Sequence, residues 1–152
     1  MSQGTTYAFK ISTRNIHGEG PLSDSVSITP AAPPDAPSGL NLISADSTHI
    51  TFAWTAPYDG GKPINTYKVF WDAGQGTADP NAFIPTDPAT APVVANPQVT
   101  IQIGINPGLI YQFVIVAQND IGDSVMSDVV SYIAAEVPGA PRSVSEVSAD
   151  AT

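Results

Sequence analysis

The strongest constraint on the fold is an internal repeat that relates the two ends of the chain. Residues 1–48 align without a gap on residues 105–152, an offset of 104, and 18 of the 48 pairs are identical. Repeats that stack into solenoids have periods of roughly 20 to 50 residues, so a period of 104 predicts repeats that are separate domains. The identical pairs include Gly4/Gly108, Tyr7/Tyr111, Phe9/Phe113, Ile11/Ile115, Asn15/Asn119, Gly18/Gly122, Ser23/Ser127, Asp24/Asp128, Pro34/Pro138 and Pro37/Pro141.

The repeat divides the 152 residues into three parts. Because 152 equals 104 plus 48, we expect the chain to begin within one module, to cover a second and to end inside a third. Two proline-rich segments, residues 30–37 and 137–141, are expected to be stiff, extended linkers. The predicted domains are residues 1–33, the C-terminal two strands of a preceding module, residues 34–137, a complete module, and residues 138–152, the first strand of a following module.

The central part of the chain has the pattern of a β-protein. Alternating runs of β-branched and aromatic residues are separated by Gly, Pro, Asn and Asp, and no long segment has a helical period. Six or seven short strands in about 100 residues favour a β-sandwich over a closed barrel. The long segment 74–97 is expected to be an enlarged edge loop with a short strand near Phe83 and Ile84. The other expected strands are residues 40–45, 48–55, 64–72, 99–103, 109–118 and 125–133.

Several motifs in residues 35–136 together resemble the fibronectin type III family. Trp54, at the end of the second expected strand, resembles the core tryptophan of that family. The segment Ile105-Asn-Pro-Gly-Leu-Ile-Tyr111 resembles the turn that ends in the family's tyrosine corner, with Ile105 where leucine is commoner. The resemblance implies an all-β, immunoglobulin-like β-sandwich with two antiparallel sheets, three strands against four. Further matches are the loop into the third strand, residues 59–71, and the sixth strand with its hairpin, residues 111–122.

A set of apolar residues is assigned to stability rather than to recognition. Their positions come from the alternation of the strands and from the resemblance to the family. The predicted structural core consists of Trp54, Tyr67, Val69, Ile105, Tyr111, Phe113 and Ile115.

Composition argues against several classes of function. The chain has five Lys and Arg residues and 14 Asp and Glu residues. Its net charge of −9 would repel nucleic acids and anionic membranes. The absence of cysteine removes disulfides, thiolate metal sites and cysteine nucleophiles. His17 and His49 have no carboxylates at ligand spacing and are expected to be surface or turn residues. The sequence therefore predicts no catalytic residue, metal site, cofactor or small-molecule substrate, no membrane insertion, and a protein that is not an enzyme.

One sheet face offers a candidate interaction patch. The outward positions of two neighbouring strands include Phe70, Val114 and Val116, which would form an exposed apolar patch for another module or a partner. Two alternatives stay open. The β-branched residues can simply suit an outer sheet face, or the long loop of residues 74–97 can cover them.

The loops offer a second set of candidates. The resemblance implies that the loop between the last two strands, about residues 119–124, can bind cell-surface receptors, although it contains no Arg-Gly-Asp. The possible loop contacts are Asp59, Lys62, Asp120 and Asp123.

The functional expectation is a non-catalytic structural or adhesive spacer that also mediates protein–protein interaction in a multi-repeat protein. The alternatives are a spacer domain in a secreted multidomain enzyme and a mechanical module of an intracellular filament or cytoskeletal protein. The expected partners are proteins, including other copies of this chain through strand or hairpin exchange. An extracellular or cell-surface location is favoured over an intracellular, cytoskeletal one.

Overall fold

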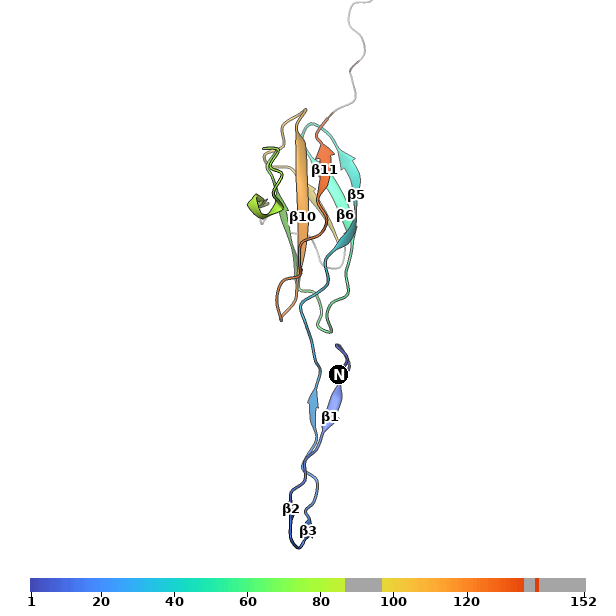
Figure 1. Ribbon diagram of the computed structural model, residues 1–152. Coiled ribbons are helices and arrows are strands. Elements are labelled where there is room, and N and C mark those ends of the chain that lie inside the picture. Colours follow the sequence, from blue (N-terminus) through green and yellow to red (C-terminus); the bar gives the residue numbers. More distant parts are fainter. Residues whose placement is uncertain (87–96, 136–138, 140–152) are drawn as a thin grey trace, which may run out of the picture.

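The computed structural model describes residues 1–86, 97–135 and 139. These residues form a β-sandwich and, extending away from one end of it, a long N-terminal hairpin (Figure 1). One 3-10 turn and no α-helix occur among the described residues. The prediction of an all-β protein is therefore confirmed.

Two antiparallel sheets make up the sandwich, three strands against four as predicted. Their strand orders are β5-β6-β9 and β11-β10-β7-β8. The short edge strand β8 pairs with β7, so the fourth strand lies close to the predicted position near Phe83 and Ile84. The bounds are β5 (Ser38–Ala45), β6 (Ile50–Thr55), β7 (Thr66–Trp71), β8 (Ile84–Pro85), β9 (Gln98–Ile101), β10 (Ile110–Gln118) and β11 (Val130–Ile133), with the 3-10 turn η1 (Pro80–Ala82) before β8.

The core lies between the two sheets and is rich in aromatic rings. Alternate residues of β7 are buried because one face of the strand points inward. The ring centroids of Phe52 and Phe113 are 4.8 Å apart, and Trp54 packs edge-on against Tyr67 at 5.1 Å. Of the predicted core residues, Ile105 is half-buried and packs against the core cluster. The others, Trp54, Tyr67, Val69, Tyr111, Phe113 and Ile115, are buried within it.

A tyrosine corner closes the turn before β10. The Tyr111 hydroxyl accepts a hydrogen bond from the Asn106 backbone N–H at 2.6 Å and donates one to the Gly104 carbonyl at 3.1 Å. The repeat reproduces part of this arrangement, because the Ser2 backbone nitrogen donates to the Tyr7 hydroxyl at 2.7 Å. Both turns therefore use a tyrosine hydroxyl to hold the backbone five residues upstream.

The N-terminal hairpin repeats the local structure of β10 and β11. Tyr7 pairs with Ile28 and Phe9 with Val26, whereas 104 residues later Tyr111 pairs with Tyr132 and Phe113 with Val130. The two hairpins thus share one register. The hairpin strands are β1 (Tyr7–Phe9), β2 (Arg14–Asn15), β3 (Gly18–Glu19) and β4 (Val26–Ile28).

The last strand, β11, is shorter than the predicted strand, which covered residues 125–133. Serine hydroxyls take the place of backbone carbonyls beside the second half of β10: the Oγ of Ser127 accepts from the Ile115 N–H at 3.0 Å, and the Oγ of Ser124 accepts from the Ala117 N–H at 2.9 Å. The backbone N–H groups of Ser124 and Ser127 still donate to the Ala117 and Ile115 carbonyls, at 2.8 and 2.9 Å, and the regular ladder begins at Val130. Ser23 binds Ile11 in the same way in the N-terminal hairpin.

The predicted apolar patch is not exposed. Val114 is 0% and Val116 6% exposed, and Phe70 is half-buried. Val114 pairs with Phe70, and Phe70 with Pro85, so the period of two places the buried Phe83 on the same sheet face. Phe83 belongs to the long segment 74–97, which supports the alternative that this segment covers the valines. Residues 87–96 of the segment lie outside the described residues.

Candidate functional site

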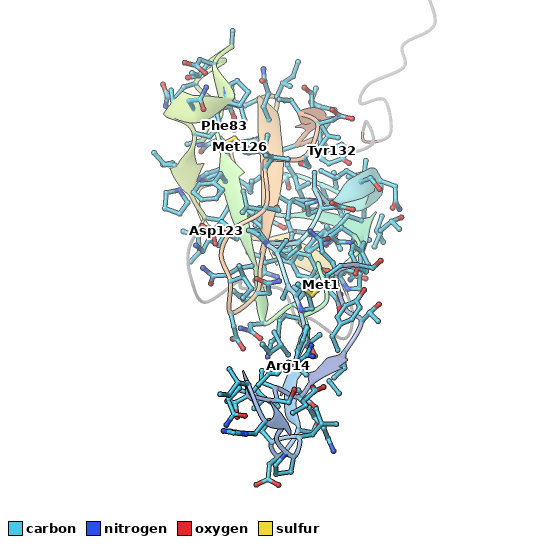
Figure 2. The ribbon with its side chains drawn as sticks, turned by 60° about the horizontal axis from the view of Figure 1, so that its bottom comes forward. Met1, Arg14, Phe83, Asp123, Met126 and Tyr132 are labelled. Atoms are coloured by element: carbon cyan, nitrogen blue, oxygen red, sulfur yellow. The ribbon has the colours of Figure 1, made fainter. Side chains whose placement is uncertain are left out.

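The N-terminal hairpin and the sandwich meet at a junction built from three segments. These are the linker, residues 30–37, the β6–β7 loop, residues 56–65, and the loop after β10, residues 119–123. Figure 1 shows β2 and β3 at the far end of the hairpin, and Figure 2 labels Arg14 in the hairpin and Phe83 and Tyr132 in the sandwich. The junction is therefore the region that connects the N-terminal hairpin to the sandwich.

The linker is hydrogen-bonded along its length. The Ala32 N–H donates to the Gly60 carbonyl at 2.9 Å and the Asp35 N–H to the Tyr58 carbonyl at 3.0 Å. Pro34 and Pro37 are buried, and a proline has few backbone conformations to lose. These bonds and the stiffness of proline hold the linker against the β6–β7 loop.

Asn119 connects all three segments through one side chain. Its amide nitrogen donates to the Ala32 carbonyl in the linker and to the Asp59 carbonyl in the β6–β7 loop, both at 2.8 Å. Its amide oxygen accepts from the backbone N–H groups of Ile121 at 2.8 Å and Gly122 at 3.1 Å. The side chain is only 3% exposed, and both amide protons and both lone pairs are used. A buried amide satisfied in this way fixes its neighbours in one arrangement.

Two glycines let the backbones approach closely at the junction. Gly60 has φ +70°, and a Cβ added there would lie 2.2 Å from the Ala32 carbonyl oxygen. Gly61 has φ +87°, and its added Cβ would lie 2.4 Å from the Gly4 nitrogen at the base of the hairpin. Both the positive φ and the missing side chain are therefore required at these positions.

The four predicted loop residues all lie in the two loops joined by Asn119. The Asp59 carboxylate accepts from the Gly61 N–H at 2.8 Å, and the Asp120 carboxylate accepts from the Asn65 side-chain amide at 2.6 Å. Asp123 forms an ion pair with Lys68 at 2.7 Å. Lys62 is exposed. The three carboxylates therefore help to hold the loops in place within the chain. Asp120 and Asp123 are exposed, and the role of the four residues as loop contacts stays a prediction.

Asn119 and Gly60 are the junction residues that sequence reasoning did not single out. The repeat contained a signal for the first, because Asn119 and Gly122 are both identical to their counterparts, Asn15 and Gly18. The Oδ1 of Asn15 accepts from the His17 N–H at 2.8 Å, as Asn119 does from Ile121. Identity at a polar loop position of a repeat therefore marked a structural role.

The titratable side chains of the described residues include no set that meets the requirements of a metal centre. No group of three or more His, Asp and Glu that could hold a metal ion occurs among the described residues. His49 lies in the β5–β6 turn with its Nδ1 2.9 Å from the Asp46 carboxylate. Hydrogen bonds from Thr48 lower the pKa of Asp46, and burial raises the pKa of the phenols of Tyr67 and Tyr132. The residues whose structure is described include no helix long and apolar enough to cross a membrane.

Comparison with known proteins identifies the family to which this chain belongs. The model of the fibronectin type III domain matches residues 35–132. A Kelch domain-containing protein of Sulfurisphaera tokodaii is 30% identical over 135 residues, covering 89% of this chain and 16% of that protein. The neural cell adhesion molecule L1 of Takifugu rubripes is 26% identical over 147 residues, covering 95% and 11%. The chain thus spans less than a fifth of the length of either relative.

Solved structures agree on the fold. The crystal structure of domains A168–A170 from titin matches with a TM-score of 0.59 and 23% identity, covering 76% of this chain and 37% of that one. Fibronectin type III domains are generally non-enzymatic, and in adhesion proteins they generally mediate protein–protein interactions. This chain belongs to the fibronectin type III domain family, through residues 35–132, as a structural and protein-interaction module.

Proposed function

We propose that this chain is a spacer that holds successive fibronectin type III modules of a multi-repeat protein in a fixed relation. The observation that carries this proposal is the Asn119 side chain, which joins the linker to both loops of the junction. A linker that only tethered two modules would need no hydrogen bonds to the loops of the sandwich. The close approach of Gly61 to Gly4 supports the same reading, because it brings the hairpin itself against the sandwich.

The proposed domain boundaries follow from this function. Residues 1–33 would be the last two strands of a preceding module and residues 34–137 a complete one, because the hairpin shares the register of β10 and β11. Residues 138–152 would be the first strand of a following module, although all of them except residue 139 lie outside the described residues.

An adhesive role at a cell surface is the finer part of the proposal. It is supported by the similarity to a relative named as a neural cell adhesion molecule over 95% of this chain. In such a role a defined angle between modules would set the distance at which other parts of the protein meet their partners.

The Asn119→Asp variant should release the linker and leave the loop after β10 in place. The new carboxylate keeps an acceptor for the Ile121 and Gly122 N–H groups but turns an oxygen toward the Ala32 carbonyl. Loss of the two hydrogen bonds to the Ala32 and Asp59 carbonyls, with repulsion between acceptors in their place, costs at least about 1.4 kcal/mol, so exchange of the Ala32 amide should accelerate at least about tenfold. Hydrogen exchange followed by NMR measures this rate.

Asn15→Asp is the matched control for this experiment. Asn15 has the same place in the N-terminal hairpin and caps its own loop, but among the described residues its amide nitrogen has no hydrogen-bond partner. The control should leave the exchange of the Ala32 amide unchanged. Equal rates in the parent chain and in Asn119→Asp would contradict the spacer function.

The N-terminal hairpin carries an apolar face that we propose pairs with a second copy of the isolated chain. Register places Tyr7, Phe9, Val26 and Ile28 on one face, and exposure of the last three ranges from 42% to 60%. Light scattering over a concentration series should show a mass that rises toward a dimer. Phe9→Lys should return the chain to a monomer, whereas Lys10→Ser, on the opposite face, should not. A monomer at every concentration would exclude this pairing.

A further inference from the structure

The end of the sandwich remote from the junction carries a second copy of the hairpin base. Gly108 corresponds to Gly4 in the repeat, and the two have φ values of +83° and +72°. The Gly4 N–H donates to the Pro30 carbonyl at 2.9 Å, and the Gly108 N–H donates to the Ala134 carbonyl at 2.6 Å. Since Pro30 and Ala134 are also 104 residues apart, the same backbone surface occurs at both positions.

Among the described residues, only one of these two surfaces is covered. A Cβ added at Gly4 would lie 3.3 Å from the Gly61 Cα and 3.2 Å from the Tyr58 hydroxyl. A Cβ added at Gly108 would meet no atom of the described residues within 4 Å. The position at which the hairpin receives the β6–β7 loop is therefore open on the sandwich.

The open surface is also more apolar than its counterpart. Ile110 and Ile133 pair across β10 and β11 and are 55% and 52% exposed. Their counterparts, Thr6 and Thr29, are joined by a hydrogen bond of 2.8 Å between hydroxyls. Two neighbouring isoleucines that are each about half exposed form an apolar surface. Such a surface is expected where a partner or another module packs against it.

We propose that Gly108, Leu109, Ile110 and Ile133 form a docking surface for the Gly-Gly β6–β7 loop of a following module, as Gly4 receives Gly61. The proposal rests on the spacer function and names the partner of the second junction. The sequence beyond the sandwich fits this partner, because Pro138 and Pro141 repeat linker residues Pro34 and Pro37. Both ends of the sandwich would then be fixed by one type of contact.

The test uses a chain that contains both junctions. Because Thr152 is the counterpart of Thr48, a copy of residues 49–135 appended after Thr152 continues the repeat in register. The sequence has no cysteine, so Ser131→Cys in each module gives two unique sites for nitroxide labels. Double electron–electron resonance then reports the width of the distance distribution between the two modules.

The parent chain should give a narrow distribution, and Gly108→Asn should broaden it at least about twofold, since asparagine tolerates a positive φ but fills the docking position. Gly61→Ala in the appended copy alone should broaden it equally. Gly76→Asn is the control, because Gly76 has φ +66° and no described atom lies within 4 Å of its added Cβ. In the 152-residue chain Gly108→Asn and Gly76→Asn should melt at the same temperature.

A broad distribution in the parent chain, or a narrow one in both junction variants, would overturn this proposal. The spacer function is judged separately, from the exchange of the Ala32 amide at the first junction. A slow Ala32 amide with a broad inter-module distribution would reject the second junction alone.

Discussion

Trp54→Ala is expected to lower the free energy of unfolding by about 3 to 5 kcal/mol, the usual cost of replacing a buried large aromatic residue by alanine. Trp54 is 4% exposed, and its ring contacts both Phe52 and Tyr67 in the core. Since single domains are stable by only roughly 5 to 15 kcal/mol, the variant should be close to unfolding at room temperature. Urea denaturation followed by circular dichroism measures the change.

Two further variants show whether burial is the cause. Trp54→Phe should cost less than half as much, because phenylalanine keeps an aromatic contact with Tyr67 and fills more of the space of the indole than alanine does. Leu42→Ala, at a side chain that is 45% exposed, should cost about 0.5 kcal/mol. A similar cost for Leu42→Ala and Trp54→Ala would contradict the assignment of the core.

Gly60→Ala should have the largest effect on the junction. An alanine at φ +70° is strained by about 1 to 2 kcal/mol, and its Cβ would overlap the carbonyl oxygens of Ala32, at 2.2 Å, and Pro33, at 2.7 Å. The linker must move away, so the Ala32 N–H loses its bond to the Gly60 carbonyl. We expect exchange of the Ala32 amide to accelerate more than tenfold, the factor that corresponds to about 1.4 kcal/mol.

Gly76→Ala separates the two causes of this effect. Gly76 has nearly the same φ, +66°, but an added Cβ meets no described atom within 4 Å. It should therefore show the backbone strain alone, about 1 to 2 kcal/mol in urea denaturation, with no change at the Ala32 amide. The same exchange rate for the Ala32 amide in both variants would mean that the contact between Gly60 and the linker does not hold the linker in place.

The sandwich could be predicted from the sequence because its signals are local and repeated. The residue types and spacing of Trp54, Tyr111 and Phe113 each indicate a buried position, and all three residues are buried. The short strand β8 lies within one residue of the predicted position because Phe83 and Ile84 are adjacent large apolar residues in a segment rich in Pro, Ala and Asp.

The burial of Val114 and Val116 could not be predicted in the same way. Alternation tells which sheet face a side chain points to, but not whether another segment lies over that face. Phe83, which the register places on the same face, lies more than 30 residues earlier in the chain, and its position depends on how a long loop folds back. The role of Asn119 could not be predicted for a related reason. Its amide binds the backbone carbonyls of Ala32 and Asp59, and because every residue type has a carbonyl, the sequence does not show which ones are bound.

The serine hydroxyls beside β10 have a consequence for a chain pulled from its two ends. A backbone ladder resists shear because many bonds break together, whereas the hydroxyls of Ser124 and Ser127 each sit on a rotatable side chain and can turn to water one at a time. Under tension we expect these two side-chain bonds to break before the backbone bonds that the Ser124 and Ser127 N–H groups donate to the Ala117 and Ile115 carbonyls, at 2.8 and 2.9 Å.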